Sequence, residues 1–191
     1  MDTLALLLHP VRLRIVHALS GGQTRTTSEL CARLPDVSKA TVYRQVSLLT
    51  RGGLLEVASE RRTHGAVERS YRLHRARATV DPQAGAAMSK DEHREAFASA
   101  IAALVAEFNT YLDRPDANPY RDAVGYTQAS LWLSRRELAD IQRIVRAAIV
   151  ASSDHLAGTG RRLYLLSPIM FPIEGPAELD PDLPPREQAR R

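Results

Sequence analysis

The stretch that decides the fold is residues 38–56, which read Ser-Lys-Ala-Thr-Val-Tyr-Arg-Gln-Val-Ser-Leu-Leu-Thr-Arg-Gly-Gly-Leu-Leu-Glu. Val42, Val46 and Leu49 recur at helical spacing, so residues 38–49 predict an amphipathic helix whose other face is polar and cationic. The Gly-Gly pair that follows ends this helix.

Two predicted strands follow the helix and form a hairpin. Residues 54–59 and 67–73 have the length and composition of short strands, with Tyr71 and Leu73 on one face of the second. The connecting residues 60–66 are rich in arginine and are predicted to form the tip of the hairpin.

A second short helix is predicted just ahead of the first. Thr26-Thr-Ser-Glu29 is a capping box that opens a helix ending before Pro35, and Ser38 caps the next helix after a two-residue turn. Two short helices joined by a tight turn predict a helix-turn-helix, and the hairpin behind it predicts a β-wing. Upstream, residues 3–20 predict an apolar helical segment that Pro10 divides in two.

Charge is distributed unevenly along the chain. Residues 1–77 hold 13 Lys and Arg against 6 Asp and Glu, whereas the remaining residues hold 13 against 16. A basic front part is typical of nucleic-acid binding, although a solvated basic surface gives the same count. No apolar run approaches the roughly 18 residues that span a bilayer, and the acidic start lacks a signal-peptide pattern. We therefore expect a cytoplasmic protein without a membrane segment.

The C-terminal half is predicted to contain helix, strand, helix and strand in that order. Capping boxes that begin at Ser89 and Ser134 open the two helices, and the apolar residues 126–133 and 162–171 are predicted as strands. The fold class is therefore α+β, with an N-terminal winged helix-turn-helix followed by a helix-strand-helix-strand dimerisation region.

Composition divides the chain into four predicted parts. Residues 1–79 form the winged helix-turn-helix, and residues 80–89, which include Asp81-Pro82, form a linker. Residues 90–174 form the C-terminal α/β region for dimerisation and sensing. Residues 175–191 are rich in Pro, Asp and Arg and are expected to be a disordered tail.

Several motifs resemble those of the ArsR-type winged helix-turn-helix repressors of bacteria. They are His9-Pro-Val-Arg-Leu-Arg-Ile-Val-His-Ala-Leu19, Thr27-Ser-Glu-Leu30, residues 38–49 and Gly53-Leu-Leu55. Residues 65–73, with Gly125-Tyr126, Leu131-Trp-Leu-Ser134 and Glu137-Leu138, resemble a bacterial subgroup that carries an added C-terminal region. The resemblance implies a homodimeric transcriptional regulator that binds promoters.

The chain departs from the metal-sensing members of that family. Those members carry Cys-x-Cys on the first helix of the helix-turn-helix, whereas the matching stretch here is Glu29-Leu-Cys31-Ala-Arg33. A thiolate site needs three or four soft ligands, and Cys31 is the single cysteine, so no metal or other cofactor is expected. Cys31 is interpreted as a small buried hydrophobe, with a redox-sensitive thiol as the alternative.

The helix over residues 38–49 and the wing supply the candidate DNA-binding residues. Arg44 can bond guanine or phosphate, and Gln45 can read adenine from the major groove. Arg69 and Arg72 should lie on opposite faces of their strand, so at most one of them faces DNA. The alternatives are that residues 38–49 form an ordinary amphipathic helix with a solvated face, and that the wing tip is a solvated loop, neither of which contacts DNA. The candidate set comprises Ser38, Lys39, Thr41, Tyr43, Arg44, Gln45, Arg61, Arg62 and His64.

The predicted function is that of a homodimeric DNA-binding regulator, in particular a repressor, whose partners are double-stranded DNA and a second copy of the chain. A regulator with a small-molecule effector pocket in the C-terminal region is the first alternative, and a winged helix used only for protein assembly is the second. No nucleophile, base or metal constellation is recognised, so an enzyme is not expected. The candidate dimer or effector surface comprises Phe97, Ile101, Phe108, Tyr111 and Trp132.

Overall fold

The computed structural model describes residues 3–63, 66–77 and 82–175. Its contacts divide the chain into two compact units, Met1–Val124 and Gly125–Arg191. Of the predicted linker 80–89, residues 80 and 81 lie outside the described residues. Of the predicted tail, only Gly175 lies within them.

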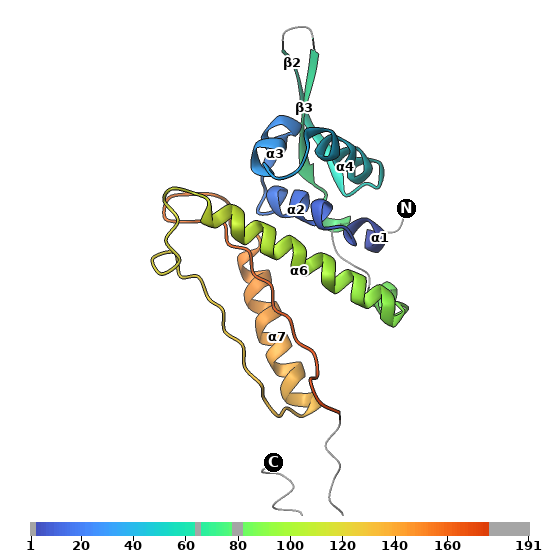
Figure 1. The fold of residues 1–191 in the computed structure, drawn as a ribbon, viewed down its shortest axis with the longest axis vertical. Coiled ribbons are helices and arrows are strands. Elements are labelled where there is room, and N and C mark those ends of the chain that lie inside the picture. The colour runs from blue at the N-terminus through green and yellow to red at the C-terminus, as the bar shows by residue number, and fades with distance from the viewer. Residues whose placement is uncertain (1–2, 64–65, 78–81, 176–191) are drawn as a thin grey trace, which may run out of the picture. The chain divides into compact units, whose positions relative to one another are not determined.

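The first unit, Met1–Val124, is called the front unit here; its described residues form six α-helices and a small antiparallel sheet (Figure 1). A 3-10 turn, η1, covers Arg75–Arg77. The helices are α1 (Thr3–Leu7), α2 (Pro10–Leu19), α3 (Thr27–Arg33), α4 (Lys39–Arg51), α5 (Pro82–Ala86) and α6 (Lys90–Leu112), and the strands are β1 (Thr24–Thr26), β2 (Leu55–Thr63) and β3 (Ala66–Leu73).

The helix starts follow from local capping and confirm the predicted starts, although α4 continues two residues beyond its predicted end at Leu49. Pro10 opens α2, and His9 caps it by accepting a hydrogen bond at Nδ1 from Val11 N over 3.2 Å. Thr26 and Glu29 form the predicted capping box of α3. Ser38 caps α4, so α3 and α4 form the predicted helix-turn-helix.

The wing hairpin is longer than its predicted strands. The antiparallel pairing of β2 with β3 runs from Leu55 opposite Leu73 to Thr63 opposite Ala66, with a bulge between Val57 and Ser59. In Figure 1 this hairpin projects beyond α3 and α4. The prediction that residues 60–63 belong to a loop was wrong, because cross-strand pairing continues through them.

A third strand escaped prediction. β1 pairs with β3, which places β3 in the centre of the sheet order β1-β3-β2. The segment Thr24-Arg-Thr26 is too short to show an alternating apolar pattern, and it is extended because it completes the free edge of β3.

The turn from α4 into β2 requires glycine. Gly53 has a φ of +74°, a region that side chains with a Cβ rarely adopt. A Cβ on Gly52 would lie 2.2 Å from Leu6 Cδ1, so α1 packs directly on the end of α4. The Gly-Gly pair therefore sets where the wing leaves the helix.

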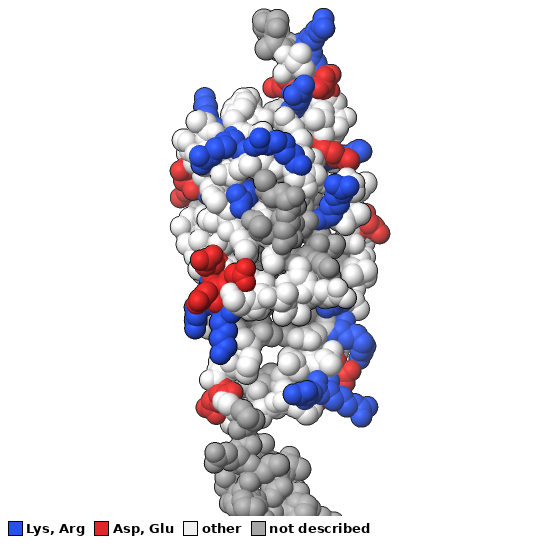
Figure 2. Space-filling model, turned by 90° about the vertical axis from the view of Figure 1, so that its right-hand side faces the viewer, with Lys and Arg blue, Asp and Glu red and all other residues white. Residues whose placement is uncertain are grey.

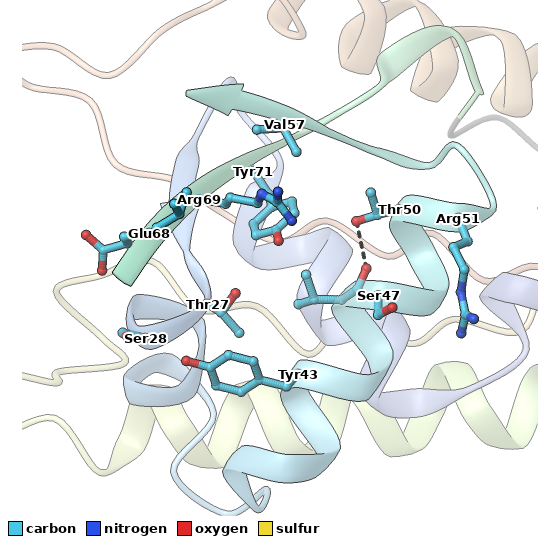
Figure 3. A pocket seen from close by; sticks show the side chains of 12 residues that line it. Thr27, Ser28, Tyr43, Ser47, Thr50, Arg51, Val57, Glu68, Arg69 and Tyr71 are labelled. Carbon is cyan, nitrogen blue, oxygen red and sulfur yellow. Dashed lines mark hydrogen bonds between the residues drawn. The ribbon is translucent and has the colours of Figure 1, made fainter. Parts of the chain in front are cut away.

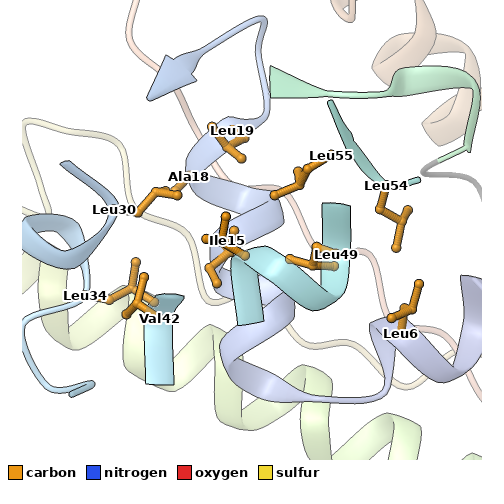
Figure 4. Close-up of a cluster of buried hydrophobic side chains, with 11 residues drawn as sticks. Leu6, Ile15, Ala18, Leu19, Leu30, Leu34, Val42, Leu49, Leu54 and Leu55 are labelled. Atoms are coloured by element: carbon orange, nitrogen blue, oxygen red, sulfur yellow. The ribbon is translucent and has the colours of Figure 1, made fainter. Parts of the chain in front are cut away.

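Eleven buried apolar side chains form the core of the front unit (Figure 4). Val42, Val46 and Leu49 contribute the inner face of α4, as their spacing predicts. Tyr71 and Leu73 pack against this core from one face of β3, also as predicted. The other core members are Leu6, Ile15, Ala18, Leu19, Leu30, Leu34, Leu54 and Leu55.

The second unit contains α7 (Arg135–Ser152), which the predicted Ser134–Glu137 capping box opens. Residues 126–133 and 162–171 form no strand, so the prediction of two strands was wrong for the described residues 125–175. A strand needs a neighbour for its backbone hydrogen bonds, and these segments have none in the described part of this unit. Every described residue of the unit is at least partly exposed.

Within the described residues, no helix has the length and apolar character required to cross a membrane.

Candidate nucleic-acid interface

The exposed face of α4 carries three cations. Tyr43 is 53% exposed, and Arg44 lies beside it on the same outward face. The spacing of four residues also brings Ser47 and Arg51 to this face, although sequence reasoning left them out. Among the described residues, Lys39, Arg44 and Arg51 form no ion pair. The predicted outward positions of Lys39, Tyr43 and Arg44 are therefore confirmed.

Gln45 does not face outward, and its predicted role in reading adenine was wrong for this geometry. It is 2% exposed, and its Oε1 accepts a hydrogen bond from Arg12 Nη1 over 3.3 Å. Gln45 lies three residues after Val42 and four before Leu49, so helical periodicity places it on the inner stripe. That spacing was the signal that could have found its place.

Ser38 and Thr41 interact at the start of α4. Thr41 N donates to Ser38 Oγ over 3.3 Å, and Ser38 Oγ donates to Thr41 Oγ1 over 2.9 Å. Thr41 is half-buried, so its hydroxyl supports the cap more than an outer surface. Ser38 itself stays exposed at an end where unsatisfied backbone N–H groups favour anions.

The predicted wing cations lie within β2. Arg61 pairs with Glu68 across the hairpin at 3.6 Å, and Arg62 lies opposite Val67. Both guanidiniums are exposed, although neither occupies a loop as predicted. His64 lies outside the described residues.

Two more cross-strand ion pairs join β2 and β3, one near the base of the wing and one past its middle. Arg69 Nε lies 2.7 Å from Glu60 Oε1, and Arg72 Nε lies 2.6 Å from Glu56 Oε1. The hydrogen bond from Arg72 lowers the pKa of Glu56. Water and salt screen exposed pairs of this kind, so they contribute little to stability and a phosphate can compete for these guanidiniums.

A groove of about 360 Å³ lies between α4 and the wing (Figure 3). Arg51 lines it from α4 and Arg69 from β3, whereas Glu68 is the acidic residue among the described residues that line it. Arg72 does not line it, in agreement with the predicted opposite faces of Arg69 and Arg72. Hydroxyl groups supply most of the other polar lining: Thr27, Ser28, Tyr43, Ser47, Thr50 and Tyr71.

Cationic side chains gather below the hairpin on the face shown in Figure 2, whereas the hairpin itself carries both signs. The pKa of His9 is affected by neighbouring positive charges. Burial lowers the pKa of His9, and the charges of Arg12 and Arg44 lower it further, so His9 is neutral at neutral pH. His9 therefore adds no charge to the cationic face.

A buried polar cluster, which the sequence did not predict, positions the turn before α4. Since α4 is the candidate DNA-reading helix, it is called the reader helix below. Arg14 of α2 is 3% exposed, and its guanidinium forms two hydrogen bonds with Asp36, of 2.6 and 2.8 Å. Asp36 lies in the turn just before Ser38. A buried arginine in an otherwise apolar helix face was the available signal, because a buried charge requires a partner.

The candidate dimer or effector residues lie in both units. On α6, Phe97 is exposed, Ile101 is half-buried, and the rings of Phe108 and Tyr111 stack at 5.9 Å between centroids. Trp132 belongs to the second unit and is 68% exposed. Their proposed role in dimerisation or effector binding stays a prediction.

Cys31 lies on α3 and is partly buried against the core, as expected of a small hydrophobe. Within the described residues, no group of three or more His, Cys, Asp or Glu side chains is arranged to hold a metal ion.

Comparison with known proteins agrees with this geometry. Residues 7–58 match the family model described as a helix-turn-helix domain. The chain therefore contains a helix-turn-helix domain, which runs from the end of α1 into β2, and such a domain suggests a DNA-binding transcriptional regulator. No curated protein matched the chain.

Proposed function

We propose that this chain is a cytoplasmic, homodimeric transcriptional regulator of the ArsR type that represses promoters by binding an inverted-repeat operator. The exposed face of α4 enters the major groove, where Arg44 bonds guanine or phosphate and Lys39 contacts the backbone. The wing lies against the adjacent minor groove and its phosphates.

The unpaired cationic face of α4 is the observation that carries this proposal. Its three cations project from a helix-turn-helix core, where nothing in the described chain neutralises them. A winged helix used only for protein assembly would have a neutral or acidic face at this position. Phosphate contacts supply affinity and register, while groups on α4 supply sequence choice.

The groove between α4 and the wing fits a sugar–phosphate strand. Arg51 and Arg69 line it, and the hydroxyl groups between them are donors of the kind that contact phosphate and sugar oxygens. In this arrangement the Arg69–Glu60 pair opens so that Arg69 can bond a phosphate.

The exposed apolar residues support a dimer. Phe97, Val105 and Leu112 lie at least 45% exposed on α6. The second unit exposes Trp132, Ile144 and Phe171 among others. Exposed apolar side chains in this number are typical of an interface, and in the proposed dimer a second copy of the chain covers them. Two reader helices about 34 Å apart then meet successive major grooves on one face of DNA.

The ArsR assignment rests on the motifs within residues 9–19, 27–30 and 38–49. Because Cys31 is the single thiol, the proposal includes no thiolate metal site. A small-molecule effector that acts through the C-terminal region remains compatible with this assignment.

Selection of bound fragments from a genomic DNA library by the full chain tests the proposal. The expected result is enrichment of one inverted-repeat motif whose half-sites lie about one helical turn apart. Enrichment without a shared motif, together with affinity that does not change with salt, would overturn it.

A further inference from the structure

The buried charges behind the reader helix join three elements of the front unit. Arg14 of α2 donates from Nε to Glu107 Oε1 over 3.4 Å and from Nη2 to Thr110 Oγ1 over 3.4 Å. Both acceptors belong to α6. The same guanidinium binds Asp36, which stands at the entrance to α4. One side chain thus contacts both the long helix and the turn that positions the reader.

Glu107 adds a second connection from α6 to the helix-turn-helix. Its Oε2 lies 3.6 Å from Arg33 Nη2, at the last residue of α3. The Glu107 side chain is only 11% exposed, so its charge depends on Arg14 and Arg33 for compensation. Any shift of α6 therefore changes the surroundings of two cations that flank the turn.

The two sides of this cluster differ in strength. Arg14 holds Asp36 by short bonds of 2.6 and 2.8 Å, whereas its contacts with α6 measure 3.4 Å. Contacts near the long limit of hydrogen bonding are lost with a small displacement. Arg14 and the turn should therefore move together, while the link to α6 makes and breaks.

The cluster is also incompletely satisfied. Among the described residues, His17 Nδ1 and Arg33 Nε are buried without a hydrogen-bond partner. Buried polar atoms without partners are rare. Here both belong to residues that interact with Glu107, because the charge of Glu107 acts on His17 and Arg33 forms an ion pair with it. This arrangement leaves donors and acceptors available for a second set of contacts.

We propose that Glu107 is a positioning residue through which α6 controls the turn before α4, so that displacement of α6 changes how the reader helix meets DNA. The link runs from Glu107 through Arg14 to Asp36, and in parallel through Arg33 to the end of α3. This inference rests on the proposed function for its effect on DNA, although the link itself is a property of the free protein.

Glu107→Gln tests the link, and Glu95→Gln is its matched control. Both variants remove one negative charge from α6, but Glu95 is exposed on that helix. The readouts are amide hydrogen exchange over residues 36–41 and affinity for two duplexes. One duplex is selected from a random library by the wild-type protein, and the other is a random sequence of the same length.

We expect Glu107→Gln to speed exchange over residues 36–41 and to weaken binding of the selected duplex by about tenfold, with a change of under about twofold on random DNA. Glu95→Gln should match the wild type in both measurements. Wild-type exchange at residues 36–41 in Glu107→Gln would overturn the proposal, as would equal loss on both duplexes.

A further variant tests the link in case Glu107→Gln does not fold. If Glu107→Gln unfolds, Thr110→Val removes one contact of Arg14 without changing charge, and it should speed exchange over residues 36–41 to a smaller extent. Unchanged exchange in that variant would overturn the link. If the wild type binds neither duplex, the proposed function fails, while the exchange data still decide whether α6 and the turn are coupled.

Discussion

Arg12 Nη1 donates a hydrogen bond to Gln45 Oε1 over 3.3 Å and holds the Gln45 amide inside the front unit. The Arg14–Asp36 pair adds a second contact, so α2 binds both the middle of the reader helix and the turn that precedes it. The orientation of α4 is thus set by polar contacts with α2 as well as by the apolar core.

Gln45→Ala should lower the free energy of unfolding by about 1–3 kcal/mol, because it removes a buried acceptor of Arg12. The base preference of bound DNA should not change. Urea unfolding and selection from a random library measure the two quantities. Ser47→Ala, on the exposed face, is the control and should stay within about 0.5 kcal/mol of the wild type. An altered base preference at wild-type stability would contradict this placement of Gln45.

Arg44→Ala should weaken binding of the selected duplex by about 1–3 kcal/mol if Arg44 bonds guanine bidentately. Fluorescence anisotropy with selected and random duplexes measures the difference. Arg143→Ala provides the control, because Arg143 is an exposed arginine on α7 paired with Asp140. An equal loss on random DNA would make Arg44 a phosphate contact instead.

Lys39→Ala should reduce the steepness of the salt dependence of DNA binding. Each neutralised phosphate contributes about −0.9 to the slope of log affinity against log salt, so the slope should become shallower by about that amount. Titrations at several salt concentrations give the slope. Lys90→Ala, which changes the other lysine of the chain, should leave it unchanged. Identical slopes for both variants and the wild type would remove Lys39 from the interface.

Asp36 should make stability sensitive to acid. The hydrogen bond from Arg14 lowers the pKa of Asp36, so the unfolded chain binds this proton more readily than the folded chain. The resulting stabilisation is present above the unfolded pKa of about 3.9 and is lost as pH falls through the depressed folded value. Asp36→Asn should be less stable than the wild type at neutral pH and should show a shallower acid dependence in chemical unfolding. Asp113→Asn, at the exposed end of α6, should keep the wild-type profile.

His17 should act at higher pH. Burial lowers the pKa of His17, while the charge of Glu107 opposes this effect only in part. Because the unfolded chain binds the proton more readily, stability should fall as pH drops below the ordinary value of 6.5. His17→Gln should flatten the unfolding free energy between about pH 7.5 and pH 5.5, whereas His93→Gln, on the exposed start of α6, should not. An unchanged profile for His17→Gln would place the titration elsewhere, with His9 as the next group to replace.

Local signals in the sequence were sufficient to predict where three of the helices start, but not α5 (Pro82–Ala86), which lies within the predicted linker 80–89. The capping boxes at Thr26, Ser89 and Ser134 each open a helix at the predicted residue, because a cap depends on three or four neighbouring residues. Gln45 was misplaced because its residue type was weighed ahead of its position in the helical period. The length of the wing followed from cross-strand pairing, which a single strand does not reveal.

Long-range contacts explain the remaining differences. The Arg14–Asp36 and Arg14–Glu107 contacts join residues 22 and 93 positions apart, so no local pattern predicts them. Residues 126–133 and 162–171 have the composition of strands, but strand formation depends on a neighbour that the described part of the second unit does not provide.

The opposed charges along the hairpin also bear on solubility. β2 is an edge strand that extends past the body of the front unit, and its open backbone could recruit the same strand of another molecule. Charged side chains on β2 disfavour such pairing, because a second hairpin beside it would bring like charges together or bury ion pairs. They are Glu56, Glu60 and Arg61. A variant in which all three are neutralised, made to probe DNA contacts, would therefore have an aggregation-prone edge strand. Its molecular mass in solution should be measured by light scattering before its DNA affinity is interpreted.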